Sequence, residues 1–341
     1  MSYSSRFFLY APLSLFLLLA AGAGLYWWHV AQALSARLDA LNGRAAMPGV
    51  VVAFKSKSVG GFPFNLDVVF SDFRITIDTP HGPSSWATQK FALHALTYGR
   101  EQMIFEAGGD QALRWRDLQG RAHALPFQVG EMHASAIAAD GAVSRIDFDL
   151  IGFGSPALTA ARVQMHARKA PGGAGIDIFA TADGVHLSPA LAPLFGPDVS
   201  SVKLNARAMP AKPIDALREG RAGWVDALEG WRAAGGAVEV GDLEISWNRL
   251  SAMGKGRLSL DAAHAVEGLL DFKVAGIETL LDAARRHDVR GGPDQGLAAA
   301  LLDRAALAGD NEAGLLGAVI DFHAGVVTLG TERATTEEPL Y

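Results

Sequence analysis

The chain of 341 residues contains no cysteine. This absence excludes a disulfide framework, a metal site with cysteine ligands and a thiol nucleophile. It is compatible with an oxidising compartment such as the bacterial periplasm. The chain also has no dense lysine and arginine cluster, and its 36 acidic and 30 basic residues leave a formal net charge of −6. We therefore expect no nucleic-acid partner, because such binding requires a basic surface.

The familiar catalytic motifs are missing as well. Residues 152–156 (GFGSP) lack the closing glycine of a nucleophile elbow, and residues 254–256 (GKG) lack the remainder of a phosphate-binding loop. The ten histidines show neither HxH nor HExxH spacing, and no paired carboxylates stand out. We therefore predict no enzymatic activity, no cofactor and no metal site. An unrecognised hydrolase is the least favoured alternative.

No charged residue occurs between Phe7 and Trp28. As a helix this stretch is about 33 Å long, enough to cross a hydrocarbon core of about 30 Å. Arg6 precedes it, which favours a cytoplasmic N-terminus and an exported body. The sequence thus predicts a single-pass protein of the bacterial inner membrane with a periplasmic body.

A cleaved signal peptide is the alternative to an anchor, because residues 21–23 (AGA) resemble a small-residue cleavage site. The apolar stretch continues past that site to Trp27 and Trp28, however, and aromatic residues are typical of a bilayer edge. An uncleaved anchor is therefore favoured. Helical spacing of apolar residues then continues to Leu41, and Gly43 is suited to end the helix.

From residue 50 onward, short apolar segments alternate with turn signals. Residues 72–78 (DFRITID) alternate apolar and polar side chains without interruption, which is typical of a half-buried antiparallel strand. Glycine-containing dipeptides at 108–109, 140–141 and 183–184 predict turns between short strands. We therefore expect an antiparallel meander rather than repeated βαβ units.

Three helices are predicted within the body. Ile214–Ala234 has an amphipathic stripe, and Ile277–His287 and Gln295–Leu307 are also expected to be helical. The predicted fold class is α+β, mainly antiparallel β: an N-terminal transmembrane helix followed by a curved multi-stranded sheet or sheets with about three packed amphipathic helices.

The predicted domain organisation has three parts. Residues 1–41 form a cytoplasmic stub, the anchor and its helical extension. Residues 42–330 form the periplasmic β-rich domain, with a candidate sub-boundary near 209–213, where the composition changes. Residues 331–341 form a polar, flexible tail.

Alternation along the predicted strands implies one strongly apolar sheet face, which something must cover. A second layer would make this face a closed core, whereas partial coverage would leave a groove for acyl chains. The sequence leaves both alternatives open. The residues assigned to this groove or core are Phe62, Phe64, Phe70, Phe73, Ile75, Ile77, Ile245, Trp247, Leu258, Leu260 and Phe272.

Several motifs resemble a known family. They are residues 59–66 (VGGFPFNL), the alternating segment 72–78, residues 246–248 (SWN), residues 254–261 (GKGRLSLD) and residues 268–272 (GLLDF). In this order they resemble a family of bacterial envelope proteins, chiefly alphaproteobacterial, that is classed as a domain of unknown function. The layout is more remotely similar to AsmA-like bridge-type proteins, and that similarity implies a curved sheet with an apolar groove and a link to lipid traffic.

The sequence therefore favours a non-enzymatic, anchored cell-envelope protein that binds or shields lipid in an apolar sheet groove or assists outer-membrane homeostasis. The expected partners are the inner membrane through Phe7–Trp28, phospholipid or another envelope lipid, and other envelope proteins. The alternative is an anchored structural or interaction scaffold with a closed core.

Overall fold

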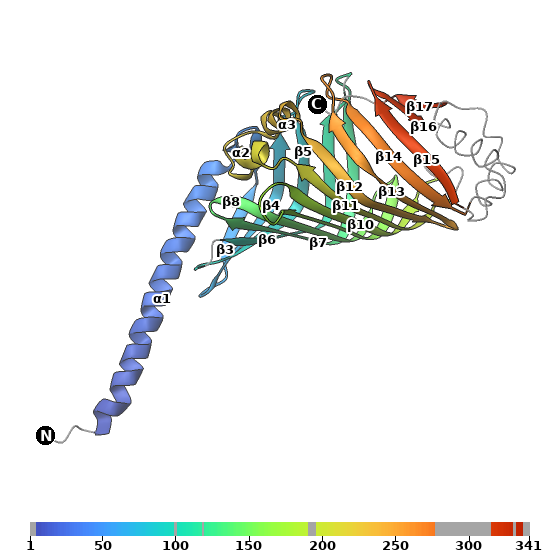
Figure 1. The fold of residues 1–341 in the computed structure, drawn as a ribbon. Coiled ribbons are helices and arrows are strands. Elements are labelled where there is room, and N and C mark those ends of the chain that lie inside the picture. The colour runs from blue at the N-terminus through green and yellow to red at the C-terminus, as the bar shows by residue number, and fades with distance from the viewer. Residues whose placement is uncertain are drawn as a thin grey trace.

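A computed structural model describes residues 5–98, 101–117, 119–189, 196–276, 315–329 and 332–336. One long helix leads into a curved, strand-rich body, and it projects away from that body at its N-terminal end (Figure 1). The body is mainly antiparallel β, as the sequence predicts.

The long helix is α1 (Ser5–Leu41), and it ends where the sequence predicts. Gly43 follows with a φ of 75°, a conformation that glycine adopts without a Cβ penalty. Its apolar part, within Tyr10–Leu41, is long enough to cross a membrane, and its most apolar window is not buried by the body. The C-terminal part differs, because Leu34 and Leu38 pack against the sheet.

The sheet begins beside α1. Strands β2 and β3 lie one after the other along the same edge of β4, and β1 extends the sheet beyond β2. The predicted strand over 50–57 is thus two strands, because the chain is interrupted at residues 54–55. The bounds are β1 (Arg44–Met47), β2 (Val50–Ala53), β3 (Ser56–Gly60) and β4 (Asn65–Ile77).

From β4 onward, each strand pairs antiparallel with the next, so a single sheet continues through the body. This meander was predicted. The bounds are β5 (Ser84–Leu96), β6 (Gln102–Arg116), β7 (Ala122–Ala139), β8 (Ala142–Gly154), β9 (Leu158–Lys169), β10 (Ile176–Leu187), β11 (Asp198–Met209), β12 (Ala237–Trp247), β13 (Leu250–Leu260), β14 (Val266–Ala275), β15 (Leu315–His323), β16 (Val326–Leu329) and β17 (Glu332–Thr336).

Two predicted turns lie inside longer strands. Gly108 and Gly109 lie within β6, at a register shift against β7. Gly184 lies within β10 with a φ of 58°, and the pairing with β9 and β11 continues past it without a shift. At the register shift, an extra residue on one strand is accommodated by a local bend, and glycine suits that bend. The prediction of two short strands on either side of each of these glycines was therefore wrong.

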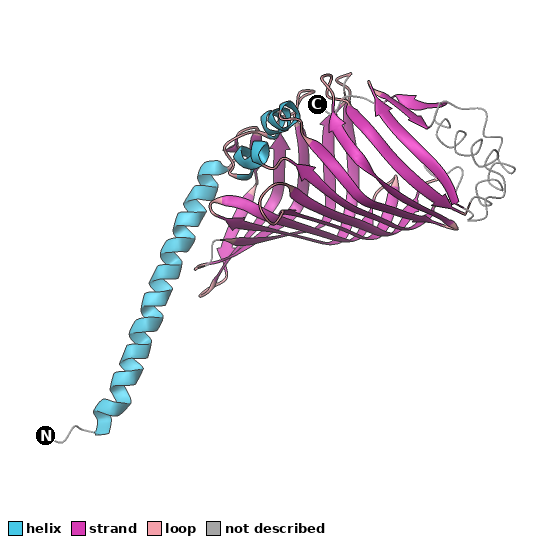
Figure 2. Cartoon of the chain, viewed as in Figure 1, coloured by secondary structure: helices cyan, strands magenta, loops and turns pink. Residues whose placement is uncertain are grey.

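Residues 210–236 connect β11 to β12 and carry the short helices of the body. They form η1 (Lys212–Ile214), α2 (Asp215–Arg218) and α3 (Trp224–Ala233), which lie at one end of the sheet in Figure 2. The prediction of one continuous helix over Ile214–Ala234 was wrong, because Gly220 has a φ of 70° and Gly223 is extended. The sheet continues across this insertion, since β11 pairs with β12.

The insertion contacts distant parts of the sheet. Trp224 Nε1 donates to the Asp78 carbonyl at 3.0 Å, and Arg218 Nε donates to the Val143 carbonyl at 2.7 Å. The predicted helices Ile277–His287 and Gln295–Leu307 lie outside the described residues. Within the predicted tail, Glu332–Thr336 forms β17.

Candidate functional site: an apolar cavity between two packed clusters

The apolar face of the sheet, defined here as the face that carries Phe73, Phe148 and Phe272, runs across the strands in register. Phe73 on β4 lies opposite Thr88, Phe148 on β8 lies opposite Ala134 and Met165, and Phe272 on β14 lies opposite Gly254 and Ala318. Partners in register share a face because side chains alternate along a strand. The other face is called the polar face.

Two clusters cover parts of this face. The first, on β4–β6, consists of Val68, Phe70, Phe73, Phe91 and Ala107, and α1 contributes Leu34 and Leu38 at its edge. The rings of Phe73 and Phe91 stack with centroids 4.2 Å apart. The second cluster, on β12–β15, consists of Val240, Leu250, Leu270, Phe272, Val274, Leu316 and Ala318.

Between the clusters, the apolar face is incompletely covered by the described residues. Leu113 on β6, Ile146 on β8 and Met165 on β9 are about two-fifths exposed, although all three point to the apolar face. A cavity of about 320 Å³, lined in part by Leu113, lies on this face and is within the size range of small-molecule pockets. Its lining is Trp86, Gln111, Leu113, Leu125, Phe127, Met132, Phe148, Leu150 and Phe153.

Gln111 is the polar residue of this cavity and is only 4% exposed. Its Oε1 accepts a hydrogen bond from Trp86 Nε1 at 2.7 Å. The indole N–H can only donate, so the Gln111 atom that faces it must be the amide oxygen, and Nε2 must point away from it. Among the described residues, Gln111 Nε2 has no hydrogen-bond partner. A buried donor without a partner costs about 1–3 kcal/mol. This nitrogen lies beneath the cavity surface, which is formed by carbon atoms.

The predicted site residues do not form one group. Phe70, Phe73 and Ile75 belong to or pack against the first cluster, whereas Trp247, Leu258 and Phe272 belong to or pack against the second. Ile77, Ile245 and Leu260 also have registers on the apolar face. The structure thus places six of the eleven predicted residues in or against two separate clusters, and none of the eleven lines the cavity between them.

Phe62 and Phe64 require a correction. They lie in the turn between β3 and β4, 60% and 64% exposed, and not on the apolar face. The ring of Phe62 instead packs edge-to-face against Trp27 of α1, with centroids 5.5 Å apart. The alternation of the following strand begins only at Leu66, after Gly61 and Pro63 have turned the chain.

Sequence reasoning missed the third of the cavity lining that comes from β7, namely Leu125, Phe127 and Met132. Residues 123–129 alternate, with His123, Leu125, Phe127 and Val129 on one side, which is a usable strand signal. Pro126 argues against a central strand, since proline cannot donate to the ladder. In the structure Pro126 lies within β7 opposite Ala112.

The polar face carries ion pairs between neighbouring strands. Asp149 accepts two hydrogen bonds from Arg162, at 2.9 and 2.7 Å, and Asp177 pairs with Arg207 at 2.6 Å. An open hollow of about 1300 Å³ lies over β8–β14 on this face. Its charged lining residues include Asp177 and Arg207, which bind each other, and Glu239 and Arg257, which pair at 3.5 Å.

Asp147 is the most connected carboxylate of this face. Partial burial tends to raise its pKa, but hydrogen bonds from His166, Arg145 and Ser135 outweigh burial and hold the pKa below the usual value of 3.8. A carboxyl group with a depressed folded-state pKa stabilises the fold above its unfolded-state pKa, and this contribution disappears as the pH falls toward the folded-state value.

We therefore expect Asp147→Asn to be less stable than the wild type at pH 6, with the difference shrinking below about pH 4. The measurement is urea unfolding of both full-length proteins in detergent between pH 3 and 6. A stability difference that stays constant over this range would contradict the assignment.

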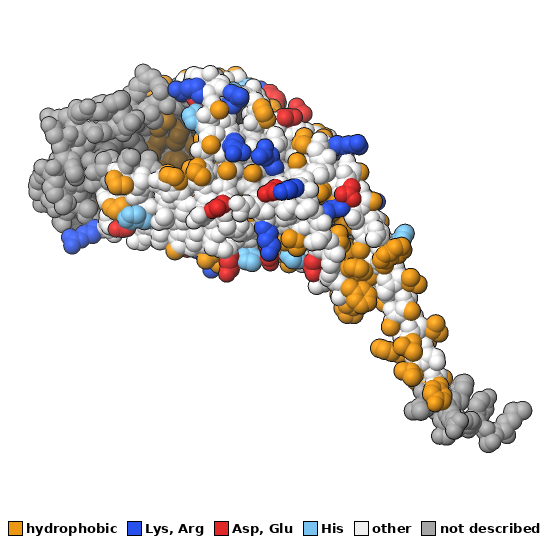
Figure 3. Space-filling view, turned by 180° about the vertical axis from the view of Figure 1, so that it is seen from behind, with side chains coloured by type: hydrophobic (Ala, Val, Ile, Leu, Met, Phe, Trp, Pro, Cys, Tyr) orange, Lys and Arg blue, Asp and Glu red, His pale blue; other side chains and the backbone are white. Residues whose placement is uncertain are grey.

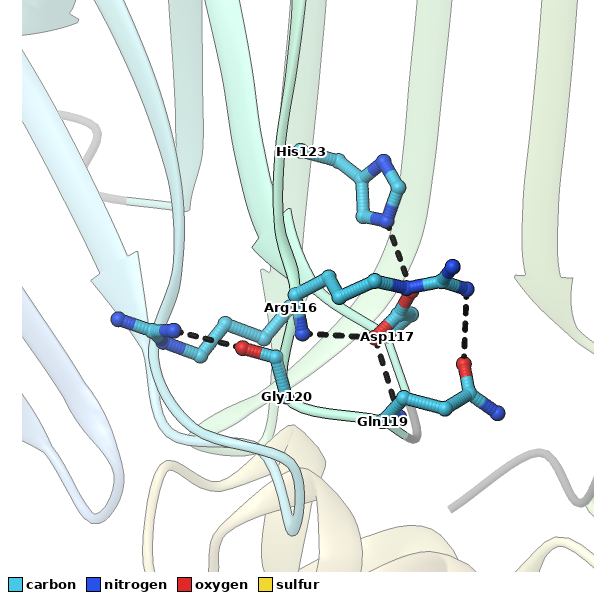
Figure 4. A network of polar contacts seen from close by, with 6 residues as sticks. Arg116, Asp117, Gln119, Gly120 and His123 are labelled. Carbon is cyan, nitrogen blue, oxygen red and sulfur yellow. Dashed lines mark hydrogen bonds and ion pairs between the residues drawn. The ribbon is translucent and has the colours of Figure 1, made fainter.

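The turn between β6 and β7 is held by Asp117, whose partners are drawn in Figure 4. Its carboxylate accepts hydrogen bonds from the backbone N–H groups of Gln119 and Arg121 and from Arg121 Nε, and it contacts His123 Nε2 at 2.9 Å. The hydrogen bond with His123 is the largest cause of a strongly lowered Asp117 pKa. The partners of Asp117 named here lie in the same turn or, for His123, at the start of β7, which is typical of a local structural motif.

In the described part of the chain, no three histidine, aspartate or glutamate residues are grouped so that they could hold a metal ion. One family model, described as an uncharacterized protein conserved in bacteria (DUF2125), matches residues 27–334. No curated protein matches the chain. The remoter similarity to AsmA-like proteins stays a prediction.

Proposed function

The chain belongs to this bacterial family of uncharacterized proteins, and we propose that it is a membrane-anchored envelope protein that binds the acyl chain of a lipid on the apolar face of its sheet. The observation that carries the proposal is the cavity of about 320 Å³ between two packed clusters. A closed core would have side chains from a second layer at this position.

The lining of the cavity supports an apolar ligand. Gln111 is its polar residue, but the Gln111 Nε2 atom is buried beneath the cavity surface. The rest of the lining is hydrocarbon and aromatic, which suits an acyl chain. The ligand class that fits this surface is an acyl lipid.

The position of the body relative to α1 supports the same ligand. The first cluster, which borders the cavity, includes Leu34 and Leu38 from the helix that continues the apolar span. A lipid source would therefore lie next to the sheet. Arg6 before the span favours an exported body, and we place that body in the periplasm.

We propose a non-enzymatic role, in which the cavity holds or shields a lipid without converting it. No catalytic motif occurs in the sequence, and the strongly shifted Asp117 belongs to a surface turn that its own neighbours satisfy. An anchored scaffold with a closed core is the alternative, and the following experiment separates the two.

Leu125→Trp should fill the cavity without adding a charge. We expect the amount of acyl lipid that stays bound to the full-length variant after purification in mild detergent to be at least about fivefold lower than for the wild type. Native mass spectrometry and lipid extraction measure this amount. The matched control is Ala124→Trp, which adds the same side chain at the neighbouring exposed position on the polar face. Both variants keep α1, so lipids that surround the anchor contribute equally.

Equal lipid content in the three proteins would contradict lipid binding and favour the scaffold. Free fatty acid released from added phospholipid by the wild type, but not by Leu125→Trp, would identify a hydrolase instead. Thermal unfolding of each variant checks that a loss of lipid does not reflect a loss of fold.

A further inference from the structure

The turns β3–β4 and β5–β6 expose large apolar side chains at the same end of the sheet. Phe62 and Phe64 belong to the first turn, and Leu96 and Tyr98 border the second; each is between 39% and 73% exposed. The Thr97 N–H and hydroxyl both donate to the Phe64 carbonyl at 2.9 Å, so the two turns are joined. We call these four side chains the apolar tip.

The apolar tip lies directly against α1. Trp27 Nε1 donates to the Asn65 carbonyl at 2.8 Å, and Tyr26 contacts the Thr97 carbonyl through its hydroxyl at 3.5 Å. In Figure 1 the turn after β3 extends downward beside the helix. Figure 3 shows apolar side chains gathered where the body meets the helix, whereas charged residues are spread over the rest of the visible surface.

The level of this contact along α1 places the tip at a bilayer. Starting at Phe7, about 20 helical residues cross a hydrocarbon core of about 30 Å, so the core ends near Trp27. A Cβ atom on Gly24 would lie 3.8 Å from the Phe62 ring. Gly24 precedes Trp27 by about 4.5 Å along the axis. Phe62 is therefore level with the outer edge of the hydrocarbon core.

The chemistry of the tip fits this level. Residues 59–66 carry no charge, and the turn presents two phenylalanines and a proline. The residue that follows this segment is Asp67, and its Oδ1 contacts His94 Nδ1 at 2.8 Å. Aromatic residues favour the interfacial region of a bilayer, and the uncharged β3–β4 turn can enter it at little cost. The β5–β6 turn also carries Arg100 and Glu101 in its sequence, and charged side chains suit the headgroup level of the same region.

We propose that the apolar tip is a second membrane contact, inserted into the bilayer interface beside α1. Its partner is the lipid surface of the membrane that α1 spans. Two contacts, the helix and the tip, hold the sheet in one orientation. The C-terminal ends of β3 and β5 and the N-terminal ends of β4 and β6 lie at the lipid, and the opposite ends of these strands lie away from it. This proposal depends on α1 spanning a membrane and is independent of lipid binding in the cavity.

The absence of cysteine allows a direct depth measurement. The full-length Phe64→Cys variant is labelled with an environment-sensitive fluorophore and reconstituted into phosphatidylcholine–phosphatidylglycerol vesicles. We expect at least about twofold stronger quenching by lipids with spin-labelled acyl chains than at Gln119→Cys. Gln119 lies in the turn beyond the opposite end of β6, roughly 50 Å away at about 3.3 Å per residue. Aqueous iodide should show the reverse order.

Iodide quenching at position 64 as strong as at position 119 would overturn the proposal. Protection of position 64 from both quenchers would also overturn it, because protein rather than lipid would then cover the tip. Tyr98→Cys provides a second labelling site on the other turn, and thermal unfolding confirms that each labelled protein is folded. Tyr98 is 73% exposed, so its replacement removes few contacts.

Discussion

Phe73→Asp is expected to lower the free energy of unfolding by roughly 5 kcal/mol, which is comparable to the whole stability of many domains. Phe73 is 4% exposed and stacks on Phe91 with an interplanar angle of 15°. Aspartate would remove this stacking and place a carboxylate among the rings of Phe70, Phe91 and Trp86. Urea unfolding of the full-length protein in detergent, followed by circular dichroism of the sheet, measures the effect.

Arg74→Asp is the matched control, because Arg74 is the next residue, is exposed and faces the other side of β4. We expect it to change stability by less than about 1 kcal/mol. Phe73→Leu is the substitute test if Phe73→Asp does not fold. It keeps an apolar side chain and should remain folded, with a loss of about 1–3 kcal/mol in the free energy of unfolding. If Phe73→Asp unfolds at the same urea concentration as Arg74→Asp, the first cluster is not a packed core.

Gly256→Ala is expected to destabilise the sheet by about 3 kcal/mol, an unusually large effect for the addition of one methyl group. A Cβ atom at Gly256 would overlap the carbonyl oxygen of Leu269 on β14, so the backbone of one strand would have to move. The second cluster depends on this pairing, since Leu270 lies opposite Gly256. Thermal unfolding of the full-length protein tests the expectation.

Gly317→Ala is the control for this substitution. Gly317 lies in β15 of the same sheet, and a Cβ atom there would have no heavy atom within 4 Å among the described residues. We expect Gly317→Ala to change the melting temperature little, or to raise it, because alanine has less backbone freedom in the unfolded chain. Equal melting temperatures for the two variants would show that β13 and β14 do not approach closely at Gly256.

The contact at Gly256 also explains why glycines occur in a motif that the sequence alone left unexplained. Residues 254–261 (GKGRLSLD) resemble a family signature, and no chemistry could be assigned to them. In the structure, a Cβ atom at Gly254 would meet the ring of Phe272, and Gly256 allows β14 to approach. The glycines of the motif thus make room for a buried ring and a neighbouring backbone.

Much of the fold could be predicted because side-chain alternation is a local property. The segment 72–78 indicates its strand, and α1 ends at Leu41 as its spacing predicts. The glycines at 108–109 could not be interpreted correctly, because a turn and a bulge require the same residue type. Only pairing with the neighbouring strand distinguishes them.

The candidate site was the least predictable part. Trp86, Gln111 and Phe148 are distant in sequence and come together only because β5 to β8 lie side by side. A single glutamine within an alternating strand resembles any polar surface residue. Its burial, and the Trp86 N–H that orients its amide, arise from the neighbouring strand.

The sequence by itself determined the apolar span of α1, the meander of antiparallel strands and the presence of one apolar sheet face, because each depends on the periodicity of neighbouring residues. The tertiary structure decided how that face is covered. Packing between strands far apart in the sequence buries Phe73 and Phe272 in separate clusters, leaves a cavity beside Gln111, and places Phe62 against α1 instead of on the sheet. How the apolar face is covered depends on which surfaces meet in space, and this cannot be predicted from a local sequence pattern.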